Sequence, residues 1–323
     1  MSDKRSIIAQ ALLDGADIRQ RLLEAGASPA SIDYELKRAD KDPLFAAAAQ
    51  LQRRISKRDW ALGLHARLAD VRESGLSIPV IDRIDPARFL DDFYAANRPV
   101  KLTGLVDHWP ALSRWTFDYL VEKVGNAVVE LQGDRDTASD YELAKDRHKR
   151  QATMRNVIHA AQAIDSSNDF YLTAYNDTTN KQALAPLWND LGPVSILRDS
   201  GGLDGFFWLG PKGTLTPFHH DLTNNLLVQV MGRKRVLMVP AWELARMKNS
   251  IHCFSGREPG EWESGDPSLP PLLECVIGPG EALFLPVGWW HHVEALDISL
   301  SMSFTNFPAD NNFVNEYPAD TRF

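Results

Sequence analysis

Apolar residues recur in residues 1–75 at the three- and four-residue spacing of amphipathic helices. The first members of this pattern are Ile7, Ile8, Ala11, Leu12, Ile18, Leu22 and Leu23. A further helix is predicted at Ser28-Pro29, because Ser28 suits the cap and Pro29 the first turn, and others begin at Pro43 and Lys57. We expect residues 1–75 to form a helical region, which is either a purely structural appendage or an element of dimerisation or substrate docking.

The pattern changes after Gly75. Residues 78–81 form a short extended segment, residues 85–97 and 115–124 are predicted helices, and residues 98–102 are a predicted strand. Beyond Asp169, short apolar runs separated by Gly/Pro turns predict the strands Phe170 to Ala174, Phe206 to Leu209, Leu226 to Met231, Val236 to Val239, Cys275 to Ile277, Ala282 to Leu285 and Ile298 to Thr305. Such a block predicts an α+β, mainly β domain over residues 76–323, built on an antiparallel jelly roll. The Gly- and Pro-rich segment 250–271 is expected to be a surface insertion or a lid.

Two pairs of polar residues in the strand-rich block have the composition of a metal site. Residues two apart in a strand point to one face, so His219 and Asp221 converge while His220 points away. A second pair, His291 and His292, follows a later strand, and periodicity does not choose between its members. Two imidazoles and one carboxylate on one face of a metal leave positions open, as in non-haem Fe(II) oxygenases. A His-x-Asp pair alone more often forms a surface hydrogen bond, so the second pair is what favours a metal.

The amino-acid composition limits the classes of protein in which such a metal site could lie. Of 323 residues, 44% are hydrophobic and 24% charged, as in globular proteins. The formal net charge of −8 argues against a broad nucleic-acid surface. Only two cysteines, Cys253 and Cys275, are present, which indicates a reducing compartment rather than a disulfide scaffold. No segment approaches the roughly 20 apolar residues of a membrane helix, and the N-terminus does not read as a signal peptide, so we expect a cytoplasmic protein.

Several motifs in order resemble the JmjC (cupin-like) oxygenases, with the closest likeness to their asparaginyl-hydroxylase branch. That branch includes the enzyme acting on the hypoxia-inducible factor. The resemblance runs from about Ile78 to Phe307 and rests on Arg98-Pro-Val-Lys-Leu-Thr-Gly, His108-Trp-Pro-Ala with Arg114-Trp115, the Thr-Pro-x-His-x-Asp run, Gly232-Arg-Lys-Arg, and Gly280-Glu-Ala-Leu-Phe-Leu-Pro followed by Trp-Trp-His-His. It implies a double-stranded β-helix.

Position by position, the resemblance implies an iron site held by His219, Asp221 and His291. It also implies a 2-oxoglutarate pocket with the polar side chains Lys234, Thr216, Tyr171, Asn225 and Asn306. In this pocket Lys234 would bind the far carboxylate of 2-oxoglutarate, helped by the hydroxyls of Thr216 and Tyr171. The cofactors and co-substrates implied are Fe(II), 2-oxoglutarate and O₂.

The residues themselves support part of this assignment. A keto acid held by a metal at one end needs a fixed cation at the other, and a Lys ammonium is a compact point charge. Lys234 lies between two arginines, so strand alternation places its side chain on the opposite face from theirs. A lysine at a solvated hairpin edge would have the same sequence pattern. Tyr171 in a strand is ordinarily core packing, and Tyr175 is a competitor. Asn306 shares a face with apolar residues and needs hydrogen-bond partners, in a pocket or in a purely structural contact.

The implied activity is hydroxylation of an unactivated C–H bond, with succinate and CO₂ as co-products. In this family the substrate is often a protein side chain, so we expect a protein or peptide substrate. Hydroxylation of a small molecule or a tRNA base and N-methyl-lysine demethylation are alternatives within the family. A metal-binding cupin without oxygen activation is an alternative of another class, which Lys234, Thr216 and Asn225 disfavour. An interaction module based on the N-terminal helices is a further alternative, which deletion of residues 1–75 would test. The segment after Phe307 is too short for the C-terminal dimer helices of the asparaginyl branch, which leaves the N-terminal helices as the expected homodimer interface.

Overall fold

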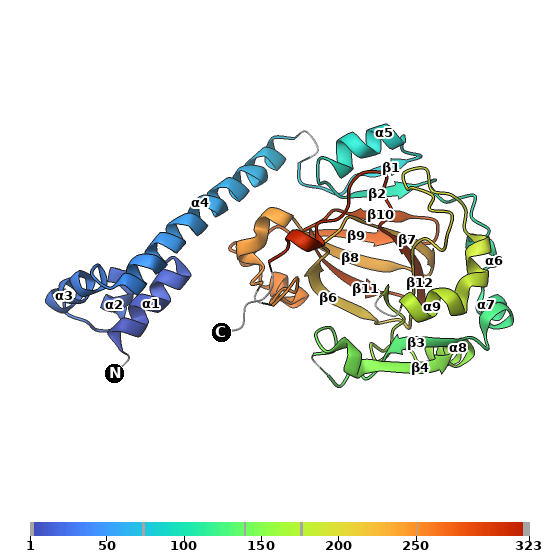
Figure 1. Cartoon of the computed structure of the whole chain (residues 1–323), viewed down its shortest axis with the longest axis horizontal. Helices are drawn as coiled ribbons and strands as arrows, with labels where there is room; N and C mark the ends of the chain where they lie inside the picture. Colours follow the sequence, from blue (N-terminus) through green and yellow to red (C-terminus); the bar gives the residue numbers. More distant parts are fainter. Residues whose placement is uncertain (1–2, 73–74, 139, 175–176, 250, 319–323) are drawn as a thin grey trace. The chain divides into compact units, whose positions relative to one another are not determined.

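The computed structural model describes residues 3–72, 75–138, 140–174, 177–249 and 251–318. The chain divides into two compact units, Met1–Leu76 and Ser77–Phe323 (Figure 1). None of the helices in the described ranges is both long and apolar enough to cross a membrane.

The first unit consists of four helices, α1 (Lys4–Asp14), α2 (Ile18–Glu24), α3 (Pro29–Ala39) and α4 (Pro43–Val71). Each helix is preceded by a capping residue whose side chain accepts a hydrogen bond from a backbone N–H of the first turn. The capping residues are Asp3, Asp17, Ser28 and Asp42. The predicted cap at Ser28 is therefore confirmed. The predicted start of a new helix at Lys57 is wrong, because α4 runs through this position without a proline to interrupt it. The buried centre of the unit is formed by Ile8, Leu22, Ile32 and Ala39.

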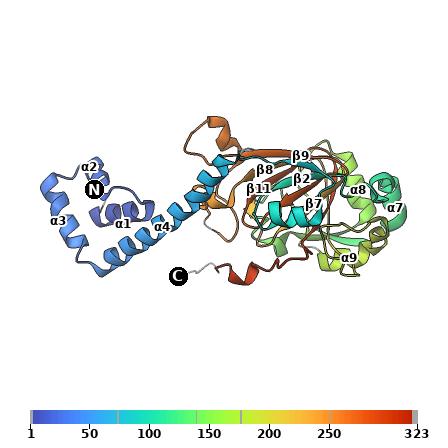
Figure 2. The same cartoon turned by 90° about the horizontal axis from the view of Figure 1, so that it is seen from above.

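Two sheets form the second unit (Figures 1 and 2). The larger has the order β1 (Val80–Asp82), β2 (Val100–Thr103), β10 (Ala282–Leu285), β7 (Asn225–Met231), β12 (Ser299–Phe304), β5 (Phe206–Gly210). The smaller has the order β6 (Leu215–His220), β11 (Trp290–Ala295), β8 (Lys234–Val239), β9 (Leu273–Ile277). All neighbouring strands are antiparallel except β1 and β2, which confirms the α+β jelly-roll fold.

Helices pack against one face of the larger sheet. They are α5 (Pro86–Phe89), a π turn η1 (Leu90–Tyr94), α6 (Ala111–Arg114), α7 (Phe117–Val124), α8 (Met154–Ala163) and α9 (Asp177–Leu184). A hairpin, β3 (Val128–Gln132) with β4 (Lys149–Thr153), forms a separate two-stranded sheet. Short 3₁₀ turns are η2 (Lys145–His148), η4 (Ala185–Asp190), η5 (Ala241–Arg246), η6 (Pro259–Ser264) and η7 (Val314–Glu316). The main core joins these layers, for example through Leu120 of α7, Ile158 of α8 and Met302 of β12.

Several predicted elements differ in the structure. Residues 170–174 are not a strand, since Tyr171 and Leu172 make only isolated bridges, with Gln132 and Leu209 respectively. The hydrophobic pattern does not predict β3, β4 or β11, because polar residues interrupt the apolar alternation in these strands. The helix expected over residues 85–97 ends earlier, at Tyr94. Short strands are defined by their partners more than by local sequence, which explains these misses.

The two faces of β12 place the site between the sheets. Leu300, Met302 and Phe304 belong to the main core, on the helix side of the larger sheet. Ser303, on the alternate face, lines a cavity that opens toward the smaller sheet. The polar face of β12 is therefore directed into the space between the two sheets.

Candidate metal centre

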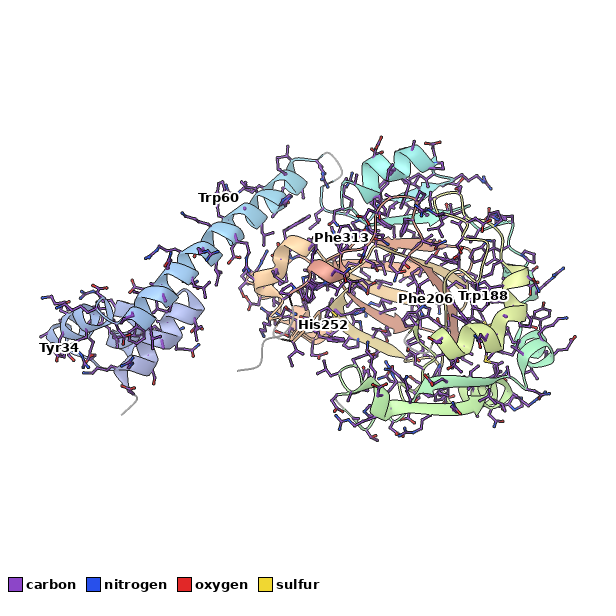
Figure 3. The ribbon with its side chains drawn as sticks, in the orientation of Figure 1. Tyr34, Trp60, Trp188, Phe206, His252 and Phe313 are labelled. Atoms are coloured by element: carbon purple, nitrogen blue, oxygen red, sulfur yellow. The ribbon has the colours of Figure 1, made fainter. Side chains whose placement is uncertain are left out.

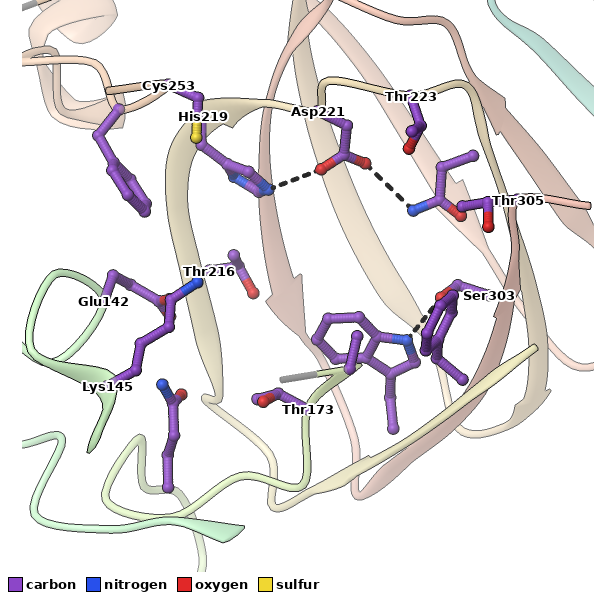
Figure 4. Close-up of a pocket in the computed structure, with 16 residues that line it drawn as sticks. Glu142, Lys145, Thr173, Thr216, His219, Asp221, Thr223, Cys253, Ser303 and Thr305 are labelled. Carbon is purple, nitrogen blue, oxygen red and sulfur yellow. Dashed lines mark hydrogen bonds and ion pairs between the residues drawn. The ribbon is translucent and has the colours of Figure 1, made fainter. Parts of the chain in front are cut away.

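His219 and His291 lie directly opposite each other on the antiparallel strands β6 and β11. Their ring centroids are 4.2 Å apart. Asp221 follows β6, and one of its carboxylate oxygens lies 3.7 Å from Nε2 of His219 (Figure 4). The other lies 3.9 Å from Nε2 of His291. One donor atom from each of the three residues lies within 4.8 Å of the others, so the cluster has the size and composition to hold one metal ion.

Backbone carbonyls orient both imidazoles. Nδ1 of His219 lies 2.9 Å from the carbonyl oxygen of Pro217, and Nδ1 of His291 lies 2.9 Å from that of Trp289. A carbonyl only accepts, so Nδ1 carries the proton in each ring and Nε2 keeps its lone pair toward the cluster. Asn225 fixes the third member by donating from Nδ2 to Oδ2 of Asp221 at 3.1 Å.

The protonation states match a metal site. Burial, reinforced by nearby His219, lowers the pKa of His291 to about 4. Burial by itself raises the pKa of Asp221, but His291, His219 and the Asn225 hydrogen bond together hold that pKa below its ordinary value. Near neutral pH the site therefore presents a neutral imidazole at His291 and an ionised carboxylate, which are the forms that ligate divalent metals.

The neighbouring histidines point elsewhere. His292 packs against Phe218 with ring centroids 5.5 Å apart, and burial lowers its pKa to about 4. His220 meets Trp290 edge-on at 4.7 Å. Neither residue belongs to the metal-sized cluster found among the described residues. The register of β6 with β11 thus selects one histidine from each pair.

A narrow inner cavity of about 70 Å³ extends from the triad to Lys234. Lys234 is only 2% exposed, and its Nζ donates to the hydroxyl of Tyr171 at 2.9 Å. Burial lowers the pKa of Lys234 to about 7. No carboxylate among the described residues forms an ion pair with it, so within that part of the chain a cation is held at the end of the cavity without an acidic partner. Thr216 and Asn225 also line this cavity.

These side chains fit the cofactors implied by the motifs. A two-histidine, one-carboxylate donor set is the ligand type of non-haem iron. Oδ1 of Asn225 is buried and has no hydrogen-bond partner within the described part of the chain, and this orphaned acceptor stands beside the triad. An anion that reaches from the metal to Lys234 would pair with the buried ammonium.

A wider outer cavity of about 300 Å³ shares Trp208, Thr216, His219, Asp221, Asn225 and Ser303 with the inner one. Its remaining wall includes Gln132, Glu142, Lys145, Cys253 and Thr305, most of them labelled in Figure 4. None of these five residues was predicted from the sequence. The alternation that puts Ser303 on the cavity face of β12, continued one residue past the strand, could have indicated Thr305. Glu142 and Lys145, the latter at the start of η2, lie in a segment with no motif.

Asn306 is not brought to the triad. It lines a separate cavity of about 330 Å³ beside Trp188 and Phe304, and its amide donates to the carbonyl of Arg198. We therefore do not carry Asn306 into the proposed cofactor pocket. Tyr175, the competitor of Tyr171, lies outside the described residues. Of the other predicted residues, the triad, Lys234, Thr216, Tyr171 and Asn225 share one cavity.

Comparison with known proteins agrees with this fold. Residues 86–310 match the cupin-like domain family. Relatives include lysine-specific demethylase 8 of Xenopus tropicalis, 29% identical over 73% of this chain and 54% of the relative. Jumonji C domain-containing protein 5 of Drosophila melanogaster is 30% identical over 72% of this chain and 60% of the relative. The tRNA wybutosine-synthesizing protein 5 of Gallus gallus is 24% identical over 74% of this chain and 80% of the relative.

The chain therefore belongs to the cupin-like family, in its JmjC group. It spans little more than half the length of the first relatives that it matches. Their names describe lysine demethylation and tRNA modification, and they do not single out an asparaginyl-hydroxylase branch.

Proposed function

We propose that this protein is an Fe(II)- and 2-oxoglutarate-dependent oxygenase that hydroxylates an unactivated C–H bond of a protein or peptide side chain. One observation carries the proposal: the His219, Asp221 and His291 cluster and the buried Lys234 line the same narrow cavity. A metal site used for structure or sensing would not need a buried cation in the same cavity as the metal ligands. The likeness to asparaginyl hydroxylases is a finer proposal that rests on the sequence motifs.

The chain's own residues divide the work of binding and orientation. His219, Asp221 and His291 would hold the iron on one face and leave the opposite face open. Lys234 would bind the far carboxylate of the keto acid and so orient its other end toward the metal. When bound, iron, 2-oxoglutarate and O₂ would supply the oxidation: one oxygen atom of O₂ would enter the substrate, and the other would enter succinate as the keto acid loses CO₂. Leu227 and Leu285 line the inner cavity and limit the access of water to it.

The outer cavity supports a side-chain substrate. It opens directly beside His219 and Asp221 and carries both an acidic and a basic residue, Glu142 and Lys145, at its wall. N-methyl-lysine demethylation is the second candidate, favoured by the names of two relatives, and it is the same oxidation at an N-methyl carbon. A tRNA substrate is less well supported, since the chain carries a net charge of −8. A small-molecule substrate is a further alternative, on which the net charge has no bearing.

The N-terminal unit is proposed to serve in self-association or substrate docking. Trp60, Leu64, Leu68 and Val71 recur along α4 at helical spacing and are 65%, 37%, 63% and 81% exposed. Figure 3 labels Trp60 on this helix. The expected cytoplasmic location stays a prediction from cysteine content, and both cysteines are free.

The decisive experiment measures conversion of 2-oxoglutarate to succinate by the purified protein with Fe(II). The parent protein is expected to turn over 2-oxoglutarate, and Asp221→Ala is expected to lose both metal binding and turnover. Proteins captured from a lysate by the protein loaded with an inert metal are then tested as substrates by mass spectrometry. A gained oxygen supports hydroxylation, and a lost methyl group supports demethylation. A parent protein that binds metal without consuming 2-oxoglutarate would contradict the proposal in favour of a non-oxygenase cupin.

A further inference from the structure

A second buried cation lies near the site, although it lines neither cavity. Arg135, which follows β3, is 2% exposed. Its guanidinium donates to the side chains of Gln132 and Glu142, the latter at 3.2 Å, and also to two backbone carbonyls. Glu142 is its only ion-pair partner among the residues that the structure describes. A guanidinium taken out of water at this depth is stable only while its neighbours stay in place.

Two hydrogen-bond partners of Arg135 form part of the wall of the outer cavity. These are Gln132 and Glu142, and we call this part of the wall the substrate mouth. One carbonyl partner belongs to Leu215, the residue before Thr216 in β6. The planar guanidinium therefore contacts the substrate mouth and the strand that carries His219 at the same time.

Arg135 also reaches the inner cavity through an aromatic ring. Its guanidinium carbon lies 5.4 Å from the ring centre of Tyr171, whose hydroxyl accepts from Lys234. Lys234 Nζ lies 5.5 Å from the same ring centre. Two cations thus share one aromatic ring, an arrangement that favours occupation of the inner cavity by an anion.

We propose that Arg135 is a positioning residue that couples the substrate mouth to the co-substrate pocket. It holds Tyr171 against Lys234 and, through Glu142 and Gln132, sets the mouth of the outer cavity. Arg135 lines neither cavity, so it would act through these neighbours, and the inference rests on the proposed function. Its consequence is that disturbing the mouth changes the affinity for 2-oxoglutarate.

The test uses the full chain loaded with Mn(II) and measures 2-oxoglutarate binding by calorimetry. Arg135→Lys keeps the charge but loses the forked contacts, so the dissociation constant is expected to rise about 10-fold or more. Glu142→Gln removes the ion pair with Arg135 and alters the mouth, but changes no residue that lines the inner cavity, and it is expected to shift the same constant. Arg114→Lys is the matched control, since Arg114 pairs with buried Asp190 and lines neither cavity, and it is expected to bind as the parent does.

A double-mutant cycle with Tyr171→Phe separates positioning from general stability. The effects of Arg135→Lys and Tyr171→Phe on binding are expected to be non-additive, because both act on the contact with Lys234. Additive effects, or unchanged affinity in a folded Arg135→Lys protein whose melting temperature alone falls, would overturn the inference. A parent protein that binds Mn(II) but not 2-oxoglutarate would instead overturn the proposed function, and this inference with it.

Discussion

His219 and His291 are paired across two antiparallel strands, and this pairing selects the candidate ligands. Because residues alternate between faces, His292 lies on the side of Phe218, where it packs with the ring and not with the triad. A one-residue slip in the register of β11 would exchange the two histidines.

The first prediction compares these two histidines. His291→Ala is expected to abolish metal binding, because it removes one of three donors. His292→Ala is expected to retain metal binding and to lower the free energy of unfolding by about 1–3 kcal/mol, because it removes a packed ring. Metal content and thermal unfolding of the two variants are the measurements. Greater loss of metal in His292→Ala than in His291→Ala would overturn the choice of ligand.

A second prediction concerns Asn225, which holds Asp221 in place. Asn225→Leu has a similar size but cannot donate, so the carboxylate loses its fixed orientation. We expect the affinity for Mn(II) to fall by about 10-fold or more. Titration followed by electron paramagnetic resonance measures this change. Asn306→Leu is the control, because Asn306 lines another cavity, and an equal loss in both variants would argue against a specific role for Asn225.

The third prediction concerns stability in the absence of ligands. The pKa of Lys234 is about 7 in the folded protein and 10.5 when unperturbed. Between these values the unfolded chain binds a proton that the folded chain does not, so this group's contribution to stability rises with pH across that window. Below pH 7 both states are protonated and the folded protein carries the full cost of the buried charge.

Lys234→Met removes that cost, so the variant is expected to melt at a higher temperature than the parent at or below pH 7. The difference should shrink as the pH rises toward 10.5. Thermal unfolding across this range is the measurement, and Lys212→Met, at an exposed position, should show no such trend. A variant that is less stable than the parent throughout would mean that Lys234 is not held as a costly buried cation.

The fourth prediction is a pH dependence of co-substrate binding. Only the protonated form of Lys234 pairs with a carboxylate, so the affinity for 2-oxoglutarate is expected to decline as the pH rises above about 7. Lys234→Arg stays charged at every accessible pH and should bind more weakly but without this slope. Lys234→Met should lose about 100-fold or more in affinity. Calorimetry with Mn(II) at several pH values tests all three, and a parent affinity independent of pH would contradict the role of Lys234.

The fifth prediction concerns the different roles proposed for the two units. A protein lacking residues 1–76 is expected to retain turnover of 2-oxoglutarate, because the triad and Lys234 all lie in the second unit. It should lose self-association or binding of its protein substrate. Light scattering and succinate formation are the two measurements, and a truncated protein that keeps both properties would remove the proposed role of the N-terminal helices. Trp60→Ser in the full chain is a milder test of the same surface.

The sequence by itself determined the jelly-roll class and most of the inward-facing residues of the candidate site. Local alternation is sufficient for this where a strand has one buried face, which is why His219 was separated from His220 and why most strands of the late block were predicted. Motif resemblance supplied Lys234, Thr216 and Asn225, and the structure places all three at one cavity.

Local periodicity did not choose between His291 and His292, and only the family resemblance implied His291; the tertiary structure shows that His291 is the member that faces His219. This pairing of β11 with β6 is a contact between residues 72 positions apart, and no local pattern encodes its register. The same holds for Arg135 and Glu142, which reach the site from a loop whose position depends on long-range hydrogen bonds. Asn306 shows the converse, since its strand pattern fitted a pocket but packing directed it to a different one.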